Sequence, residues 1–318
     1  MDNQNCPQIS VLDPIGVAIE KTSTILFKPF DFAKWFTIGF CAWLVTLCQR
    51  GGFNFNFNSP FGNTNRGGIS LEQVQEFVLS HLPLIIGIGS GVFIVSIAVG
   101  IVFLWLSSRG NFMFLSCVAQ NKAEVKLPWH KYRQEGNSLF LFRLVVSVIS
   151  FFVFIILAGI VGVLIFTFRK NGMDMTVLLI GGLIALGVVV LPIGLLFSVF
   201  IKSTLDFVVP IMYLHRITCT QAWGRFWKLL KNNIGKFLLY FLFQIVIGMA
   251  IGAITLAAMA LTCCCAACIM AIPYLGTVLM LPLLVFMRSY SLCYLRQYGS
   301  DYDVFPAVEL PPETISPQ

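Results

Sequence analysis

The sequence has little charge. Asp, Glu, Lys and Arg make up 11% of its 318 residues, against about 25% in a typical soluble domain. The 21 Lys and Arg residues are too few, and too surrounded by apolar residues, to coat a phosphate backbone, so we expect no nucleic-acid partner. A disordered chain is excluded as well, because 58% of the residues are hydrophobic and the mean hydropathy is +0.86. This composition predicts a multi-pass integral membrane protein.

Groups for catalysis are also scarce. The chain has three histidines, and the topology derived below puts His81 on the opposite side of the membrane from His130 and His215. The sequence has no nucleophile elbow, phosphate loop or metalloprotease motif. We therefore expect no catalytic residue, no metal site and no cofactor, and predict that the protein is not an enzyme.

Signals for secretion are missing too. Residues 1–10 contain no basic residue and no apolar signal core, so the first span is expected to act as its own insertion signal. No Asn-x-Ser/Thr motif occurs, and most of the ten cysteines lie in or beside apolar runs, which disfavours structural disulfides. These features indicate a bacterial cytoplasmic (inner) membrane.

Uncharged runs define the expected spans, because a bilayer core of ~30 Å needs ~20 helical residues. The run at residues 237–287 has 51 residues and contains Pro273 and Pro282, so we divide it into a hairpin. The run at 35–48 has only 14 residues and is the shortest candidate. The predicted spans are residues 33–49, 82–107, 143–168, 175–201, 236–261 and 271–293.

The basic residues predict the orientation. If all six segments cross, seventeen of the 21 Lys and Arg residues fall on one side. Cytoplasmic loops carry the Lys and Arg excess, so both termini are expected in the cytoplasm.

An amphipathic segment followed by two apolar runs recurs three times, with the amphipathic parts at residues 11–27, 128–136 and 219–232. We therefore predict an all-α integral membrane protein in which residues 1–300 form one domain of six transmembrane helices, arranged as three pseudo-repeats of amphipathic helix plus helical hairpin. Residues 49–68, where Phe and Asn alternate, are expected to form a low-complexity extracytoplasmic loop. Residues 301–318, rich in proline, are expected to be a disordered cytoplasmic tail.

The third amphipathic segment is a candidate lipid interface. Trp223 and Trp227 recur at helical spacing, while Arg225, Lys228 and Lys231 occupy another face. Such a helix lies in the interface with its cations toward anionic headgroups, so we expect membrane lipids, anionic ones in particular, as partners. Packing of this helix against the bundle is the alternative interpretation. A homo-oligomer or another membrane protein as partner is left open.

Arg109, Asp206 and Arg288 form a candidate polar cluster, because each lies near the cytoplasmic end of a predicted span. A carboxylate flanked by arginines is neutralised, whether the cluster is functional or a structural ion pair. Cys265 and Cys268 form a candidate thiol pair for metal or redox chemistry. Their apolar setting favours the alternative that they pack as small hydrophobic residues.

Three short stretches resemble uncharacterised bacterial multi-pass membrane protein families akin to the membrane domain of glycerophosphoryl diester phosphodiesterases: residues 206–210 (DFVVP), 223–227 (WGRFW) and 288–292 (RSYSL). The resemblance implies a six-span membrane domain over nearly the whole chain. It does not imply hydrolysis, because the chain has no room for the soluble phosphodiesterase domain.

We therefore expect an inner-membrane protein without catalytic activity that associates with lipids or organises a membrane complex. The alternative is a small-solute or lipid transporter with a polar site at the cytoplasmic helix ends.

Overall fold

The computed structural model describes residues 9–47, 82–170, 175–262 and 272–305, and within these ranges all regular structure is helical. In chain order the elements are α1 (Asp13–Phe27), α2 (Phe32–Thr46), α4 (Leu82–Gln120), α5 (Lys126–Lys131), α6 (Arg133–Lys170), α7 (Met175–Ser203), the π-helical turn η1 (Thr204–Val208), α8 (Val209–His215), α9 (Cys219–Asn232), α10 (Ile234–Leu261), α12 (Pro273–Leu279), α13 (Leu281–Arg296) and the 3-10 turn η2 (Ser300–Tyr302). The predicted all-α class is confirmed for this part of the chain.

Four stretches of helix are long and apolar enough to cross a membrane. They lie in α4, in α6, in the helix that runs from α7 through η1 and α8, and in α10. In α4 and α6, no residue of the most apolar window is buried within the protein. Exposed apolar side chains over such lengths are stable in lipid and not in water, so these helices indicate a membrane location.

The other two predicted spans take a different form. For the segment predicted at 33–49, α2 has 15 residues and is about 22 Å long, shorter than the ~30 Å bilayer core. The segment predicted at 271–293 is divided between α12 and α13, which meet at Met280. Four of the six predicted segments therefore lie in helices long enough to cross, and the three-repeat plan remains a prediction.

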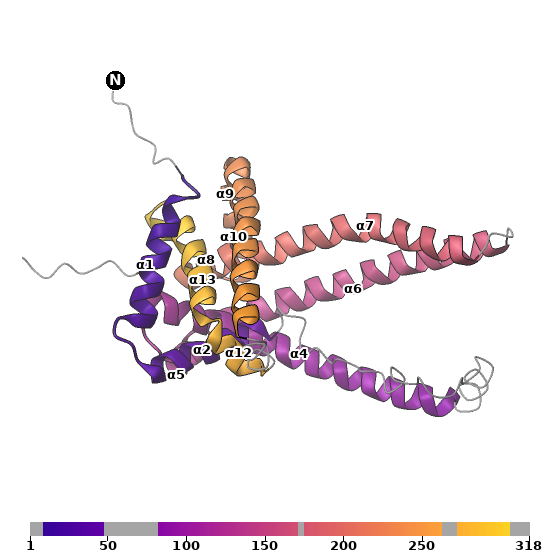
Figure 1. Ribbon diagram of the computed structural model, residues 1–318, viewed down its shortest axis with the longest axis horizontal. Helices are drawn as coiled ribbons and strands as arrows, with labels where there is room; N and C mark the ends of the chain where they lie inside the picture. The colour runs from indigo at the N-terminus through magenta and orange to yellow at the C-terminus, as the bar shows by residue number, and fades with distance from the viewer. Residues whose placement is uncertain (1–8, 48–81, 171–174, 263–271, 306–318) are drawn as a thin grey trace, which may run out of the picture.

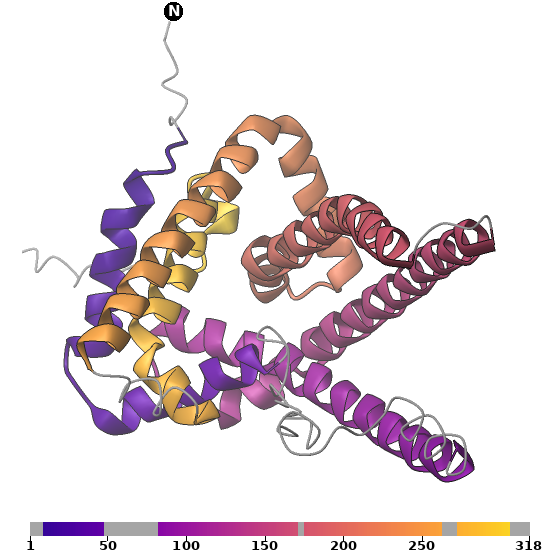
Figure 2. The same ribbon diagram turned by 45° about the vertical axis from the view of Figure 1, so that its right-hand side comes forward.

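The packed core lies at one end of the long helices. Figures 1 and 2 show α6 and α7 side by side, projecting away from the remaining helices, with α4 extending on the same side and diverging from them. In the same views α10 lies along α13, in another direction, so the long helices do not form one parallel bundle. The core contains fully buried aromatic residues from α4, η1, α9, α10 and α13, among them Phe112, Phe207, Phe226, Tyr240 and Tyr290.

Aromatic contacts join α10 to its neighbours. The ring of Tyr240 lies 4.9 Å from that of Phe207, 5.7 Å from that of Tyr290 and 4.6 Å from that of Tyr294, between centroids. The hydroxyl of Tyr294 also donates to the carbonyl of Lys236 at 2.9 Å. Aromatic pairs at these separations stabilise the packing beyond their buried area, which fixes the start of α10 against α13.

Helix α2 packs tightly and antiparallel against the last part of α4. Lys34 donates to the Asn121 side chain at 2.8 Å, and Ser107 donates to the carbonyl of Val45 at 3.0 Å. Between these contacts, a Cβ at Gly110 would lie 2.6 Å from the Cβ of Leu44. Helix α4 runs continuously through Gly110. The glycine permits the close approach of the two helices.

The two ends of the described chain are attached to α13 and to the residues after it. The backbone amide of Ser10 donates to the Gln297 side chain at 2.7 Å, and that side chain donates back to the Ser10 carbonyl at 2.9 Å. Asp303 pairs with Arg296 at 3.0 Å, and Phe305 is buried. Residues 301–305 of the expected tail are therefore packed, while residues 306–318 and the expected loop at 49–68 lie outside the described residues.

Candidate functional site

The site begins at η1, the π-helical turn between α7 and α8. Here the amide of Val209 donates to the carbonyl of Thr204 and not, as in an α-helix, to that of Leu205. The amide one position later belongs to Pro210, which has no N–H. The Leu205 carbonyl instead accepts a hydrogen bond from Nη1 of Arg288 at 2.6 Å. The turn thus exposes a backbone acceptor that binds α13 to the α7–α8 helix.

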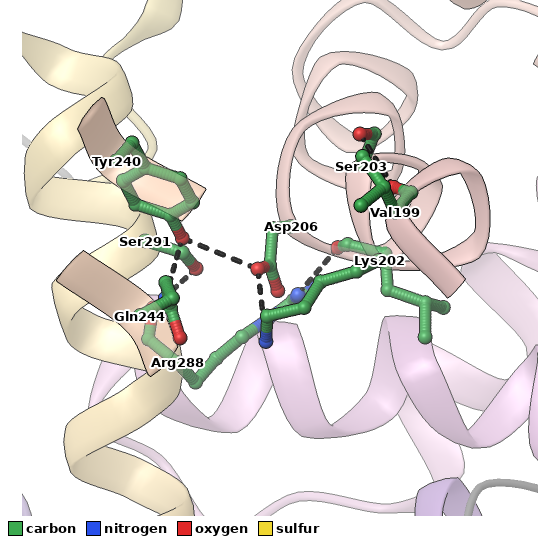
Figure 3. Close-up of polar contacts among 9 residues, drawn as sticks. Val199, Lys202, Ser203, Asp206, Tyr240, Gln244, Arg288 and Ser291 are labelled. Atoms are coloured by element: carbon green, nitrogen blue, oxygen red, sulfur yellow. Dashed lines mark hydrogen bonds and ion pairs between the residues drawn. The ribbon is translucent and has the colours of Figure 1, made fainter. Parts of the chain in front are cut away.

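Asp206, in the same turn, connects three elements (Figure 3). Its Oδ2 lies 3.3 Å from Nζ of Lys202, one turn earlier, and accepts a hydrogen bond from the Tyr240 hydroxyl at 3.2 Å. The Tyr240 hydroxyl also accepts from Nε2 of Gln244 at 2.7 Å. The carboxylate is therefore neutralised by a partly exposed ammonium group and held in place by α10.

Arg288 is the most unusual residue of the site. Only 8% of its surface is exposed, and its Nε and Nη2 atoms have no hydrogen-bond partner. Within the described ranges, no carboxylate lies within 4.0 Å of its guanidinium. The nearby carboxylate of Asp206 pairs with Lys202. A buried cation with unpaired donors is costly, so it marks a place where an acceptor would bind strongly.

A cavity of about 1300 Å³ opens beside these residues, between α2, α4, α6, α7 and α13. The part nearest the packed core contains all the charged side chains of the lining, Arg143, Lys202, Asp206 and Arg288, together with Asn111 and apolar neighbours such as Leu205 and Met287. The part farther out along the helices is lined by apolar side chains, among them Phe93, Ile97, Phe151 and Phe154. The cavity is therefore polar at one end and apolar at the other.

Arg109 is not brought to this site. Its guanidinium lies between two indole rings, 4.5 Å from the centroid of Trp105 and 4.7 Å from that of Trp129, and donates to Asn137 at 3.2 Å. It is not among the residues that line the cavity. The predicted cluster thus separates into Asp206 and Arg288, which both line the cavity without pairing with each other, and Arg109, which joins α4 to α5 and α6. The position of Arg109 along its helix could be predicted from the sequence. The direction of its side chain around the helix axis could not.

The five candidate lipid-interface residues lie on α9, and four of them are exposed. A capping box at Thr218 starts the helix and fixes its faces. Trp223 stacks on Phe200 at 4.6 Å and belongs to the packed part of the protein. The exposed set, called the α9 surface below, consists of Arg225, Trp227, Lys228 and Lys231.

Cys265 and Cys268 lie outside the described residues. In the part of the chain that the structure describes, no group of three or more His, Cys, Asp or Glu residues is placed to hold a metal ion. Another pair of thiols does meet: the Sγ atoms of Cys41 and Cys117 lie 4.0 Å apart where α2 packs on α4. Burial raises the pKa of the Cys219 thiol to about 12, which makes this residue unreactive.

Several residues of the site were not predicted. Lys202 precedes Asp206 by four residues, which is the spacing of a helical ion pair, and that signal was available in the sequence. Gln244 is the only Asn or Gln in the uncharged run at 237–287, a second usable signal. The role of the Leu205 carbonyl could not be predicted from the sequence, because it depends on the π-helical turn of the backbone and not on the leucine side chain. Arg143 marked the start of a predicted span, but the sequence did not indicate that its side chain lines a cavity.

Comparisons with known proteins add a family and no activity. The model of a family of unknown function, DUF7544, matches residues 9–281. No curated protein and no solved structure matches the chain. The expected relation to the membrane domain of glycerophosphoryl diester phosphodiesterases is not shown by these comparisons.

Proposed function

Because the chain belongs to DUF7544, a family of unknown function, we propose a function from its own structure: it is a lipid-associated integral membrane protein without catalytic activity, located in a bacterial cytoplasmic membrane. The observation that carries this proposal is the α9 surface, which lies directly before a helix whose apolar side chains are exposed.

The arrangement of α9 and α10 fits a membrane interface. Trp227 is 51% exposed beside three exposed cations. One residue, Asn233, separates α9 from the apolar α10, where Ile234 and Leu238 are exposed. Tryptophan and basic residues at the point where a helix enters the bilayer are typical interfacial anchors. Each basic residue near an anionic surface contributes about 1 kcal/mol to membrane attraction. We infer that α9 lies on the cytoplasmic leaflet.

The topology of the proposal follows the basic residues. Placing α9 and both termini in the cytoplasm keeps seventeen of the 21 Lys and Arg residues on that side. Six crossings and the three-repeat plan remain part of this proposal, with α2 and the α12–α13 pair as the segments whose crossing is to be measured. Association with lipid needs only the four long helices.

The test uses the tryptophan of the α9 surface as a local reporter. The protein is placed in nanodiscs with equal fractions of phosphatidylglycerol and phosphatidylcholine, one of the two being brominated so that it quenches nearby indoles. The Trp227→Phe variant identifies the Trp227 part of the signal. We expect stronger quenching of Trp227 by brominated phosphatidylglycerol, because the neighbouring cations attract the anionic lipid.

Replacing Arg225, Lys228 and Lys231 together by Gln should remove that preference. A matched variant with three other exposed cations replaced, Lys122, Lys126 and Lys131, should keep it. Equal quenching by the two brominated lipids in the unmodified protein would refute the proposal.

The second candidate function is a small-solute or lipid transporter, which the polar end of the cavity favours. In this hypothesis Asp206 takes part in a transport cycle through its pairing with Lys202 and Tyr240. The test compares substrate or lipid translocation in proteoliposomes between the unmodified protein and Asp206→Asn. If the two rates are equal, the transport role of Asp206 is abandoned.

A further inference from the structure

We propose that the cavity between α4, α6 and α7 binds one anionic phospholipid, with its phosphate at the polar end and its acyl chains along the apolar walls. This inference rests on the proposed lipid association and adds a specific site to it. The site is separate from the α9 surface, because none of Arg225, Trp227, Lys228 and Lys231 lines the cavity.

The polar end of the cavity carries an excess of positive charge. Arg143, Lys202 and Arg288 line it together with one carboxylate, Asp206, so the formal sum over these four side chains is +2. Lys202 and Asp206 pair with each other, and Arg143 and Arg288 supply the formal excess of positive charge. A phosphodiester carries one negative charge and presents several acceptor oxygens, which is the geometry that arginine binds best.

The unsatisfied donors identify where the phosphate would lie. Arg288 is held by one hydrogen bond to the Leu205 carbonyl, and its Nε and Nη2 are buried at the cavity wall without a hydrogen-bond partner, so a phosphate reaches them after a small rotation of the side chain. On the facing helix, Arg143 donates to the hydroxyls of Ser107 and Ser108 at 3.2 and 3.4 Å, and this fixes its position at the same end. The two guanidinium groups come from different elements and both line the cavity.

The size and walls of the cavity fit a lipid better than a small solute. Its volume of about 1300 Å³ exceeds the roughly 300–1,000 Å³ of pockets for drug-sized ligands. Along α6 the lining runs from Arg143 to Phe154, which is about 17 Å at the rise of an α-helix and close to half of the ~30 Å bilayer core. One end thus matches a headgroup and the remainder matches acyl chains of one leaflet.

The apolar walls also give a route of entry. Phe93, Phe151 and Phe154 line the cavity and are each more than half exposed, so the cavity is open toward the region that lipid occupies. A lipid can therefore enter sideways from the bilayer without crossing water. Basic pockets between membrane helices on the cytoplasmic side are typical sites for anionic headgroups.

The experiment is native mass spectrometry of the protein released from nanodiscs of mixed phosphatidylglycerol and phosphatidylcholine. We expect one retained phosphatidylglycerol per chain and no retained phosphatidylcholine. The Lys202→Gln variant replaces a side chain that is 40% exposed in the unmodified protein, so it should fold. It should retain the lipid about tenfold more weakly, because the Asp206 charge is left uncompensated near the bound phosphate.

A second variant fills the cavity without changing charge. Gly100 lines it, and a side chain at this position meets nothing within 4 Å at its Cβ, so Gly100→Phe should fold and displace the acyl chains. Gly162→Phe is the matched control, because Gly162 is also on an apolar helix with free space but does not line the cavity. The control should retain the lipid, and Gly100→Phe should lose it.

The experiment distinguishes a lipid bound in the cavity from a soluble anion and from a lipid bound on α9. If inorganic phosphate or glycerol phosphate in the buffer displaces the retained lipid, the site recognises the soluble anion and the lipid proposal is overturned. Retention that survives both Lys202→Gln and Gly100→Phe but fails in the α9 triple glutamine variant would place the lipid on α9 and would also overturn it. If no lipid is retained while Trp227 still prefers brominated phosphatidylglycerol, the cavity proposal fails and the proposed function stands.

Discussion

The contact between α2 and α4 gives the sharpest test of the packing. A methyl group at Gly110 would lie 2.6 Å from the Cβ of Leu44, 3.2 Å from its carbonyl carbon and 3.3 Å from the amide nitrogen of Val45. None of these atoms can rotate away, because two belong to the backbone and the third is attached directly to it. Gly110→Ala must therefore push the two helices apart.

The expected magnitude is the difference between two effects. Overpacking of a tight contact costs about 1–3 kcal/mol, and a rigid backbone contact belongs in the upper part of that range. Replacing glycine by alanine inside a helix stabilises the helix by up to about 1 kcal/mol, which offsets part of this cost. Gly110→Ala should thus lower the free energy of unfolding by about 1–2 kcal/mol. Gly100→Ala, ten residues earlier in the same helix and with free space around its Cβ, should be neutral or slightly stabilising.

Thermal unfolding in detergent micelles, followed by tryptophan fluorescence at one scan rate, compares the two variants. We expect the Tm of Gly110→Ala to fall by roughly 2–4 °C relative to Gly100→Ala. Adding Leu44→Ala should not restore stability, because alanine keeps the Cβ that makes the contact. Equal Tm values for the two glycine variants would refute the close approach of α2 to α4.

Three further predictions concern single contacts. Since burial raises the pKa of Cys219 to about 12, N-ethylmaleimide at pH 8 should modify it roughly 1,000-fold more slowly in the native protein than in SDS, as followed by peptide mass spectrometry, and similar rates would contradict its burial. Glu135→Gln removes the charge that pairs with Arg216 at 2.9 Å and should cost about 1–3 kcal/mol, measured as a lower Tm; an unchanged Tm would count against this pair. Trp129→Leu removes one of the two rings that contact Arg109. It should lower the free energy of unfolding by about 0.5–2 kcal/mol more in the unmodified protein than in an Arg109→Met background. A coupling energy of zero in this double-mutant cycle would exclude the cation–π contact.

The positions of most helices follow from local sequence signals. Uncharged runs of more than 20 residues cannot be stable in water, so they predicted the segments found in α4, α6, α7 and α10. The amphipathic spacing at residues 219–232 agrees with α9, where a capping box gives a definite start. The start of α13 after Met280 agrees with Pro282, which lies in the first turn of the helix, where its missing N–H leaves no backbone acceptor unpaired.

The short first segment shows the limit of hydropathy. Its 14 uncharged residues are fewer than the ~20 that a crossing helix needs, and it was predicted to cross because of the distribution of basic residues. The contact of Lys34 with Asn121 and the close approach at Gly110 place α2 along the end of α4, and only the tertiary structure contains this information.

The sequence by itself indicated apolar helices suited to a membrane, and it determined at which position along each helix the few charges lie. It did not determine which charges meet, because the direction of a side chain around its helix depends on how neighbouring helices are rotated and spaced. Arg109 points to two tryptophans, whereas Arg288 reaches the Leu205 carbonyl that the turn before Pro210 leaves without a backbone donor. The cavity, with its charged side chains at one end, exists only because α4 diverges from α6 and α7 beyond the packed core.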